Sequence, residues 1–239
     1  MGSGMLPAGA YVTQEHEYIL LFRKGGKRVF KNGPEKDARK ASAIFWEERN
    51  RWYSDTWSDV YGVRQETGDK SLRQRSAAYP LELPLRLILM YSAAGDTILD
   101  PFAGTGTTMQ AALSTGRHSV SYETDKAFAP LIEERARTAP GLSHSIARSR
   151  YEDHQRFVEE RLASGKVIKH THATWDMPVV TSQEKEMTLP VTLAVDGDVT
   201  GFSAEHGAFV PGQAPPSAKP VAETNDTTTK APNQMALFA

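Results

Sequence analysis

The sequence predicts an α/β fold with a doubly wound parallel sheet, followed by a β-rich extension and a disordered tail. Residues 96–138 carry the main signal, because a strand, a small-residue loop, a helix, a second strand and a second helix follow one another there. The composition permits a packed core, since 39% of the 239 residues are hydrophobic and 24% are charged.

Composition also excludes several classes of protein. No apolar run approaches the roughly 18 residues of a membrane-spanning helix, and the first residues lack the basic and apolar stretches of a secretory signal. The chain has no cysteine, which excludes disulfide bonds, thiolate zinc sites and a cysteine nucleophile. We therefore expect a cytoplasmic protein with no membrane partner.

The first part of the chain is predicted to hold short elements that precede the sheet. Residues 18–23 and 27–30 are rich in β-forming residues and are separated by Gly25 and Gly26, which predicts two strands joined by a turn. Residues 38–51 predict a helix. Residues 85–92 (LRLILMYS) predict a buried helix with Pro84 near its first turn.

From residue 96 onward strands and helices alternate. The expected strands are 96–100 and 118–123, each ending in an acid, and the expected helices are 107–114, 125–138 and 148–164. The pattern becomes β-like over residues 166–210, with a turn signal at 196–198. Residues 211–233 contain five prolines and almost no large apolar group, so they are predicted to be disordered.

The loop between the first predicted strand and its helix is the motif that carries chemistry. It reads DPFAGTGTT over residues 100–108, and its glycines allow a sharp turn and a close approach to a ligand. A dinucleotide, a phosphate or S-adenosylmethionine would suit such a loop, but it lacks both GxGxxG and the GK[ST] of a P-loop. Glu123, after the next strand, suits a ribose diol and favours a nucleoside-bearing cofactor. The structural alternative is an ordinary β-α turn.

Residues 77–125 resemble the joined cofactor motifs of DNA amino-methyltransferases, which methylate adenine N6 or cytosine N4. The family pattern comprises an FP-like entry, an apolar helix, a DPFxGxGTT loop, a GR pair and an acid after a strand. This sequence matches it with Tyr79-Pro80, residues 85–90, residues 100–108, Gly116-Arg117 and Glu123. Residues 15–30 also resemble the strand and turn that precede the family's target-recognition region. The resemblance covers residues 1–190.

The resemblance implies a partial Rossmann-like S-adenosylmethionine-dependent methyltransferase sheet and a set of domain limits. Residues 1–165 would form the methyltransferase domain, with a target-recognition segment at 24–75 and a cofactor-binding core at 77–140. Residues 166–210 would be the β-rich extension and residues 211–239 the tail. The implied cofactor-binding residues are Tyr79, Pro80, Asp100, Pro101, Phe102, Ala103, Gly104, Thr105, Gly106, Thr107 and Glu123.

Double-stranded DNA is the partner that the resemblance implies. Residues 23–40 contain eight Lys/Arg and two Asp/Glu, a balance of 8 − 2 = +6, and they lie near many aromatic residues. The residues expected to meet phosphates are Lys24, Lys27, Arg28, Lys31, Arg39 and Lys40. Charge alone favours a solvated face, and core packing is the favoured role for at least two of Trp46, Trp52 and Trp57.

The family's catalytic motif, [DNS]-P-P-[YFW], does not occur in this sequence. Its polar side chain and a proline carbonyl would hold the amine of a flipped base while the aromatic ring stacks on that base. In the permuted class that this order resembles, the motif lies before the target region, hence upstream of Met1. The resemblance thus implies either that the chain is truncated or that a second methyltransferase chain supplies the catalytic residues. The identity of those residues is unknown from this sequence. A catalytically inactive subunit that binds cofactor and DNA is the alternative; a methyltransferase of RNA or of a small molecule is a third.

The end of the chain carries a second short motif. Gln234, Leu237 and Phe238 resemble the Q-x-x-L-F peptide by which bacterial replication and repair proteins bind the sliding clamp. A flexible tether that presents two apolar anchors suits a hydrophobic groove. A tail that merely ends in apolar residues is an equally good interpretation.

Overall fold

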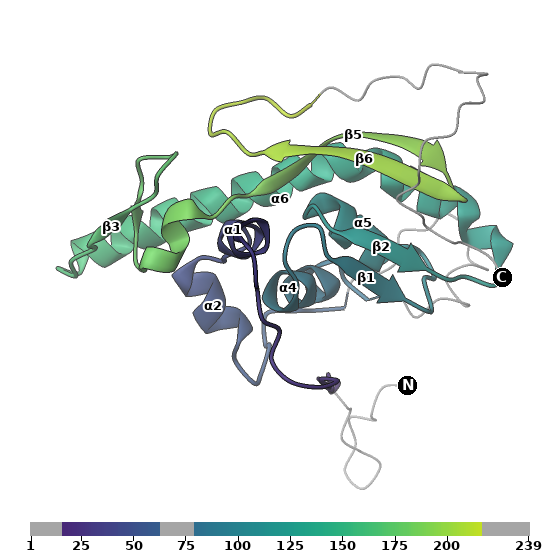
Figure 1. Ribbon diagram of the computed structural model, residues 1–239, viewed down its shortest axis with the longest axis horizontal. Coiled ribbons are helices and arrows are strands. Elements are labelled where there is room, and N and C mark those ends of the chain that lie inside the picture. The colour runs from purple at the N-terminus through teal and green to yellow at the C-terminus, as the bar shows by residue number, and fades with distance from the viewer. Residues whose placement is uncertain (1–15, 63–78, 217–239) are drawn as a thin grey trace, which may run out of the picture. The chain divides into compact units, whose positions relative to one another are not determined.

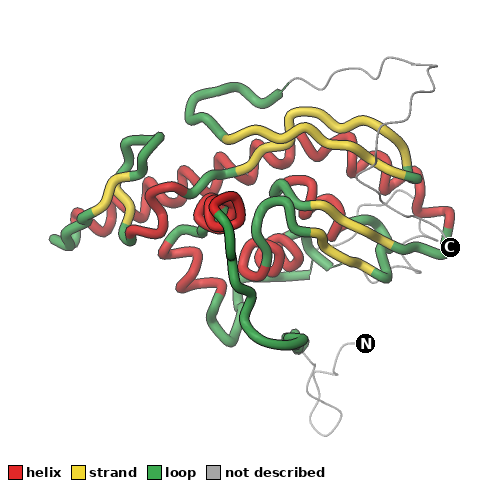
Figure 2. The backbone as a smooth tube through the Cα atoms, in the orientation of Figure 1, coloured by secondary structure: helices red, strands yellow, loops and turns green. Residues whose placement is uncertain are grey.

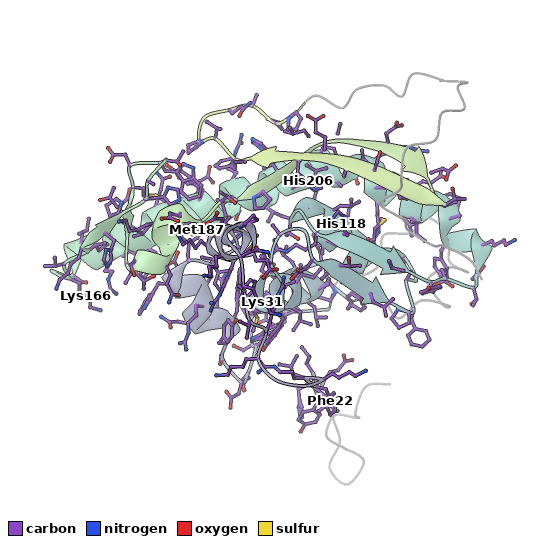
Figure 3. The ribbon with its side chains drawn as sticks, viewed as in Figure 1. Phe22, Lys31, His118, Lys166, Met187 and His206 are labelled. Carbon is purple, nitrogen blue, oxygen red and sulfur yellow. The ribbon has the colours of Figure 1, made fainter. Side chains whose placement is uncertain are left out.

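The computed structural model describes residues 16–62 and 79–216, and the chain divides into two units, residues 1–31 and residues 32–239. The described part of the first unit, residues 16–31, contains no strand, so the two strands predicted at 18–23 and 27–30 are wrong. Tyr18 and Phe22 are 81% and 89% exposed, and Figure 3 labels Phe22. An isolated two-stranded hairpin is only marginally stable in water, because nothing covers its apolar face.

The second unit contains the predicted β-α-β unit. Strand β1 (Thr97–Asp100) and strand β2 (His118–Ser121) pair in parallel, with Thr97 opposite His118 and Asp100 opposite Ser121. Helix α5 (Thr107–Ser114) connects them, with the bounds that the sequence predicts. The α/β class is thus confirmed in the described residues, where this sheet has two strands.

Helix α4 (Glu82–Tyr91) precedes this unit, as expected from the apolar run at 85–92. Its buried side chains Leu85, Ile88 and Leu89 form one core cluster with Ala111 and Ala112 of α5. The small alanines let the two helices approach closely, and this packing fixes α5 against the sheet. The same cluster includes Trp52.

A single helix, α6 (Ala129–Ala163), replaces the two separate helices predicted at 125–138 and 148–164. It follows the short 3-10 turn η1 (Lys126–Phe128) and continues through Pro140. Proline costs one backbone hydrogen bond in a helix interior, but Ala136, Ala139 and Ala147 are buried on both sides of it. Packing therefore outweighs the local penalty. Among the described residues, no helix is both long and apolar enough to cross a membrane.

The β-like segment predicted at 166–210 is confirmed as short strands. Strands β3 (His170–Thr171) and β4 (Pro178–Val179) pair antiparallel, and a 3-10 turn, η2 (Ser182–Glu186), follows them. Strands β5 (Pro190–Asp198) and β6 (Gly201–Ala208) form a hairpin that runs along α6 (Figure 1). The predicted turn at 196–198 is wrong, because those residues pair with β6 and the chain reverses at Val199 and Thr200.

The β5–β6 hairpin packs on the β-α-β unit as well as on α6. Thr192 of β5 is fully buried; its backbone N donates to Ser143 Oγ of α6 (2.7 Å), and its hydroxyl donates to the Leu113 carbonyl of α5 (2.8 Å). His206, labelled in Figure 3, lies 2.8 Å through Nε2 from the same carbonyl oxygen. Leu113 O is one of the last carbonyls of α5, so the hairpin supplies hydrogen-bond donors to a carbonyl at the C-terminal end of that helix.

Two helices, α1 (Gly33–Ala41) and α2 (Trp46–Trp52), replace the single helix predicted at 38–51. Figure 2 shows the non-helical link between them, residues 42–45. Phe45 in this link has extended backbone and is fully buried, stacked on the ring of His154 at 4.0 Å between centroids. A continuous helix would not direct Phe45 into this core, so burial of one aromatic ring decides the break.

The tryptophans near α2 contact other residues of the unit. Trp52 is 2% exposed, Trp46 stacks on Phe157, and Trp57 Nε1 donates to the Trp52 carbonyl oxygen (2.8 Å). The interpretation that at least two of these tryptophans are packing residues is confirmed, because Trp52 is buried and the half-buried Trp46 stacks on Phe157. Their rings are consequently engaged in the fold, although they lie within the segment that the resemblance assigns to DNA recognition.

A buried histidine links α6 to α2. His154 Nδ1 lies 2.7 Å from Glu47 Oε1, and its Nε2 lies 3.1 Å from the Pro178 carbonyl oxygen. Both partners accept hydrogen bonds, so a ring that carries two protons satisfies both. Burial lowers the pKa of His154, but the hydrogen bond and charge of Glu47, with the Pro178 carbonyl, outweigh burial and raise that pKa above 6.5.

This pair makes the stability of the protein depend on pH. The folded pKa of His154 is raised, so its contribution to the free energy of unfolding is complete below pH 6.5 and is lost as pH rises through the folded pKa. We expect the free energy of unfolding, measured with urea, to fall as pH rises from about 5 to about 8. In Glu47→Gln this fall should be smaller. Parallel profiles for the two proteins would contradict the assignment.

Candidate functional site

The loop after β1 is held in a sharp turn by its own backbone. Tyr122 N donates to the Asp100 carbonyl oxygen (2.9 Å), Ala103 N to that of Tyr122 (2.8 Å), and Gly106 N to that of Ala103 (2.8 Å). Gly106 has φ +78 and begins α5. A Cβ at Gly106 would lie 3.2 Å from Ile132 Cγ1, so both its conformation and its close packing on α6 require glycine.

Glu123 is brought onto this loop. Its Oε2 accepts a hydrogen bond from Gly104 N (2.7 Å), and its Oε1 accepts one from Asp125 N (2.8 Å). Each carboxylate oxygen has a further lone pair, so the half-buried side chain can still accept two hydroxyl groups. The loop and the acid, which are far apart in the sequence, therefore form one site.

Tyr79 closes the other side of the loop. Its hydroxyl lies 2.6 Å from Thr108 Oγ1 and donates to Asp100 Oδ2 at 3.4 Å. Asp100 Oδ1 accepts from Phe102 N (3.1 Å), so this carboxylate holds both the loop and Tyr79. Burial raises the pKa of Tyr79, which keeps its hydroxyl protonated and able to donate.

The remaining loop residues differ in accessibility. Phe102 is 85% exposed, so its ring is free to contact a ligand. Thr105 and Thr107 are buried, and their hydroxyl oxygens lie 3.1 Å apart. These two threonines stabilise the loop from within, and they would meet a cofactor through backbone groups.

Arg135 is a residue of this site that the sequence interpretation missed. It lies on α6, and its Nη1 donates to Thr107 Oγ1 at 2.7 Å. Burial lowers the pKa of Arg135, although guanidinium remains charged at neutral pH. Nothing in the sequence distinguishes Arg135 from the other charged residues of this helix, because the contact joins positions 28 residues apart.

The six predicted DNA-contacting residues fall in both units. Lys24, Lys27, Arg28 and Lys31 belong to the first unit, where the Arg28 guanidinium lies 4.5 Å from the centre of the Phe30 ring. Arg39 and Lys40 lie in the last turn of α1. Lys40 Nζ forms an exposed ion pair with Glu186 (2.9 Å).

One cluster has the residue types of a metal site, and most of its polar atoms already form hydrogen bonds, whereas Glu47 Oε2 is buried without a partner among the described residues. Glu47, His154 and Glu184 each offer one ligand atom within 4.8 Å of one another. Glu184 Oε1 accepts from Trp46 N, its Oε2 accepts from Thr181 N and Oγ1, and Glu47 is bonded to His154. These bonds give the cluster a structural role between α2, α6 and η2. Gln234, Leu237 and Phe238 of the clamp-like motif lie outside the described residues.

A comparison with protein families shows the family to which the chain belongs. The sequence pattern of the family described as DNA methylase matches residues 2–134, more than half of the chain. This chain belongs to the DNA methylase family. The resemblance to N6-adenine and N4-cytosine DNA amino-methyltransferases, first seen at residues 77–125, is therefore confirmed.

Two curated relatives illustrate the relationship. The chain is 52% identical over 189 residues to the type II methyltransferase M.MthZI of Methanothermobacter thermautotrophicus, covering 79% of this chain and 52% of that protein. It is 50% identical over 135 residues to the type II methyltransferase M.MjaI of Methanocaldococcus jannaschii, covering 56% and 43%. The chain thus spans about half the length of these curated relatives.

A solved structure is also similar in sequence. This DNA modification methylase of Thermus thermophilus, solved in complex with S-adenosyl-L-methionine, is 37% identical over 49% of this chain and 42% of its own, with a TM-score of 0.39. That score is too low for the two arrangements in space to be compared.

Proposed function

We propose that this DNA methylase family member binds S-adenosylmethionine and takes part in methyl transfer to adenine N6 or cytosine N4 of double-stranded DNA. The observation that carries this proposal is the Glu123 carboxylate, which bonds to Gly104 N and joins the acid to the glycine loop. Its relatives M.MthZI and M.MjaI are type II methyltransferases. A protein that methylates cellular DNA works in the compartment that holds it, the cytoplasm of a prokaryotic cell.

The side chains of the site fit the nucleoside part of this cofactor. Glu123 would accept the two ribose hydroxyls, and the exposed ring of Phe102 would contact the adenine. Tyr79 and Pro80 would lie over the methionine end, since the Tyr79 hydroxyl is fixed at Thr108 and Asp100. When bound, the cofactor supplies a methyl group on a sulfonium, which an amine nitrogen can attack directly.

On the DNA side, basic residues would neutralise phosphates. Lys24, Lys27, Arg28, Lys31, Arg39 and Lys40 are the candidates. The ammonium of Lys40 already pairs with Glu186, so a phosphate would have to replace that exposed ion pair. The tryptophans at 46, 52 and 57 are packed within the unit, so base contacts would come from other residues.

The catalytic residues would come from further polypeptide that completes the sheet, either a longer form of this chain or a second methyltransferase chain. Among the described residues β1 and β2 pair only with each other, and Leu99 of β1 is 64% exposed. Parallel sheets are normally buried on both faces, so this sheet presents an apolar side chain and unpaired strand edges to a partner. The chain spans only about half the length of its relatives, so they carry polypeptide outside the matched part that could fill this role.

A subunit that binds cofactor and DNA without turnover is the second candidate. The observation in its favour is that [DNS]-P-P-[YFW] does not occur in the sequence. The nearest described segment, residues 176–178, has the side chain of Met177 buried in the core and the Pro178 carbonyl bonded to His154. Those residues therefore have a structural role.

Tritiated S-adenosylmethionine distinguishes the two candidates. The purified full chain is mixed with DNA and labelled cofactor, with and without a cell extract, and cofactor binding is measured in parallel by calorimetry. Label transferred by the chain alone would establish an enzyme and remove the need for further polypeptide. Transfer that requires the extract supports shared catalysis, and binding without transfer in either case supports the inactive subunit. Absence of cofactor binding would overturn both.

We also propose that the C-terminal peptide binds a sliding clamp through Gln234, Leu237 and Phe238. The support is the residue pattern alone. The full chain and a form without residues 233–239 are passed over an immobilised bacterial clamp. Equal retention of both forms, or retention of neither, would refute the proposal.

A further inference from the structure

The position of Arg135 suggests that its positively charged side chain binds an anionic ligand. The one hydrogen bond from its guanidinium to the described residues goes to Thr107 Oγ1, which leaves other N–H groups of the guanidinium available. None of the acids in residues 16–62 and 79–216 forms an ion pair with it. By contrast Arg137, two residues along, pairs with Glu133 at 3.1 Å.

The electrostatics around Arg135 favour an anion. Thr107 is the first residue of α5, so the guanidinium is bonded to the helix end that carries partial positive charge. No side chain caps that end, since Gly106 is the N-cap. A cation beside a helix N-terminus is unfavourable by itself. A bound anion would interact favourably with both the cation and the helix N-terminus.

The loop that follows β1 gives this anion a chemical identity. Within the loop, Glu123, a negative group, is bonded to Gly104 N, which suits neutral hydroxyl donors. Where the loop enters α5, Arg135 is bonded to Thr107, and the Tyr79 hydroxyl lies against the next residue, Thr108. S-adenosylmethionine has a ribose diol at its centre and a single anionic group, the methionine carboxylate, at one end.

We propose that Arg135 binds the methionine carboxylate of S-adenosylmethionine and selects for a cofactor that carries it. Thr107 orients the guanidinium through its hydroxyl, and the Tyr79 segment borders the same end of the site. This inference rests on the proposed cofactor. It adds a specificity-determining residue from α6, outside the loop motif.

Two ligands that differ in the carboxylate test this role. The full chain and Arg135→Gln are titrated by calorimetry with S-adenosylmethionine and with decarboxylated S-adenosylmethionine. We expect the wild type to prefer the complete cofactor by about 10- to 100-fold, the worth of a charge-assisted hydrogen bond, and Arg135→Gln to lose that preference. Arg137→Gln is the matched control and should keep it, because that side chain is exposed and paired with Glu133.

The outcomes separate this inference from the proposed function. If Arg135→Gln weakens both ligands equally, the residue is only a structural link between α6 and α5, and the inference is wrong. An unchanged preference in Arg135→Gln also overturns it. If the wild type binds neither ligand, the cofactor proposal itself fails and takes this inference with it. Thermal unfolding of each variant shows whether the fold is retained.

Discussion

Replacing Glu123 by alanine is expected to weaken binding of S-adenosylhomocysteine to the full chain by about 100-fold or more. Two hydrogen bonds from ribose hydroxyls to a carboxylate are lost, each contributing about 1.5–3 kcal/mol. The substitution also removes the acceptor for Gly104 N and Asp125 N, so the loop loses one of the bonds that join it to the residues after β2 and keeps that of Ala103 N to Tyr122. Calorimetric titration measures the change in affinity.

Glu159→Ala is the matched control for this experiment. Glu159 is an exposed acid on α6, more than 20 residues along the helix from Arg135, and its removal changes the net charge by the same amount. We expect it to bind S-adenosylhomocysteine as the wild type does. Wild-type affinity in Glu123→Ala would show that the ribose lies elsewhere, and the proposed cofactor site would have to be abandoned.

The largest expected effect on stability comes from Glu48→Ala. Glu48 Oε1 and Oε2 accept from Arg150 Nε (2.6 Å) and Nη2 (2.8 Å), and Oε2 also accepts from Phe45 N (2.9 Å). The two side chains are only 6% and 10% exposed. Removing one partner leaves a buried guanidinium uncompensated, which costs about 3–5 kcal/mol of unfolding free energy. Urea unfolding followed by circular dichroism measures this loss.

An exposed ion pair provides the comparison. Lys40 and Glu186 are 2.9 Å apart with side chains 56% and 59% exposed, so Glu186→Ala should cost at most about 1 kcal/mol. The double substitution Glu48→Met with Arg150→Met should recover much of the lost stability, because it leaves no unpaired buried charge. Similar losses of unfolding free energy for Glu48→Ala and Glu186→Ala would mean that burial does not determine how much these ion pairs contribute to stability.

The sequence predicted the β-α-β unit well because its signals are local. An acid ends β1, glycines form the loop, and the helix at 107–114 has the predicted bounds. The predicted strand at 18–23 failed for the opposite reason. β-propensity describes fit to a sheet surface, and residues 18–23 have no sheet partner among the described residues of their unit.

Helix boundaries in the rest of the chain depended on packing. Pro140 and Gly141 suggest a helix end, but α6 continues because alanines on both sides of Pro140 are buried against neighbouring elements. The break at 42–45 has no glycine or proline to mark it. It exists because Phe45 is buried against His154, which lies more than 100 residues further along the chain.

The sequence by itself indicated the family of this protein through residues 77–125, and the loop with Glu123 favoured a nucleoside-bearing ligand. These signals are local, because turn chemistry and an acid after a strand are properties of neighbouring residues. Only the tertiary structure decided that Arg135 meets Thr107 and that Glu48 and Arg150 form a buried pair. Both contacts join residues far apart in the chain. Their energies arise from burial and charge in the folded unit, which no local pattern encodes.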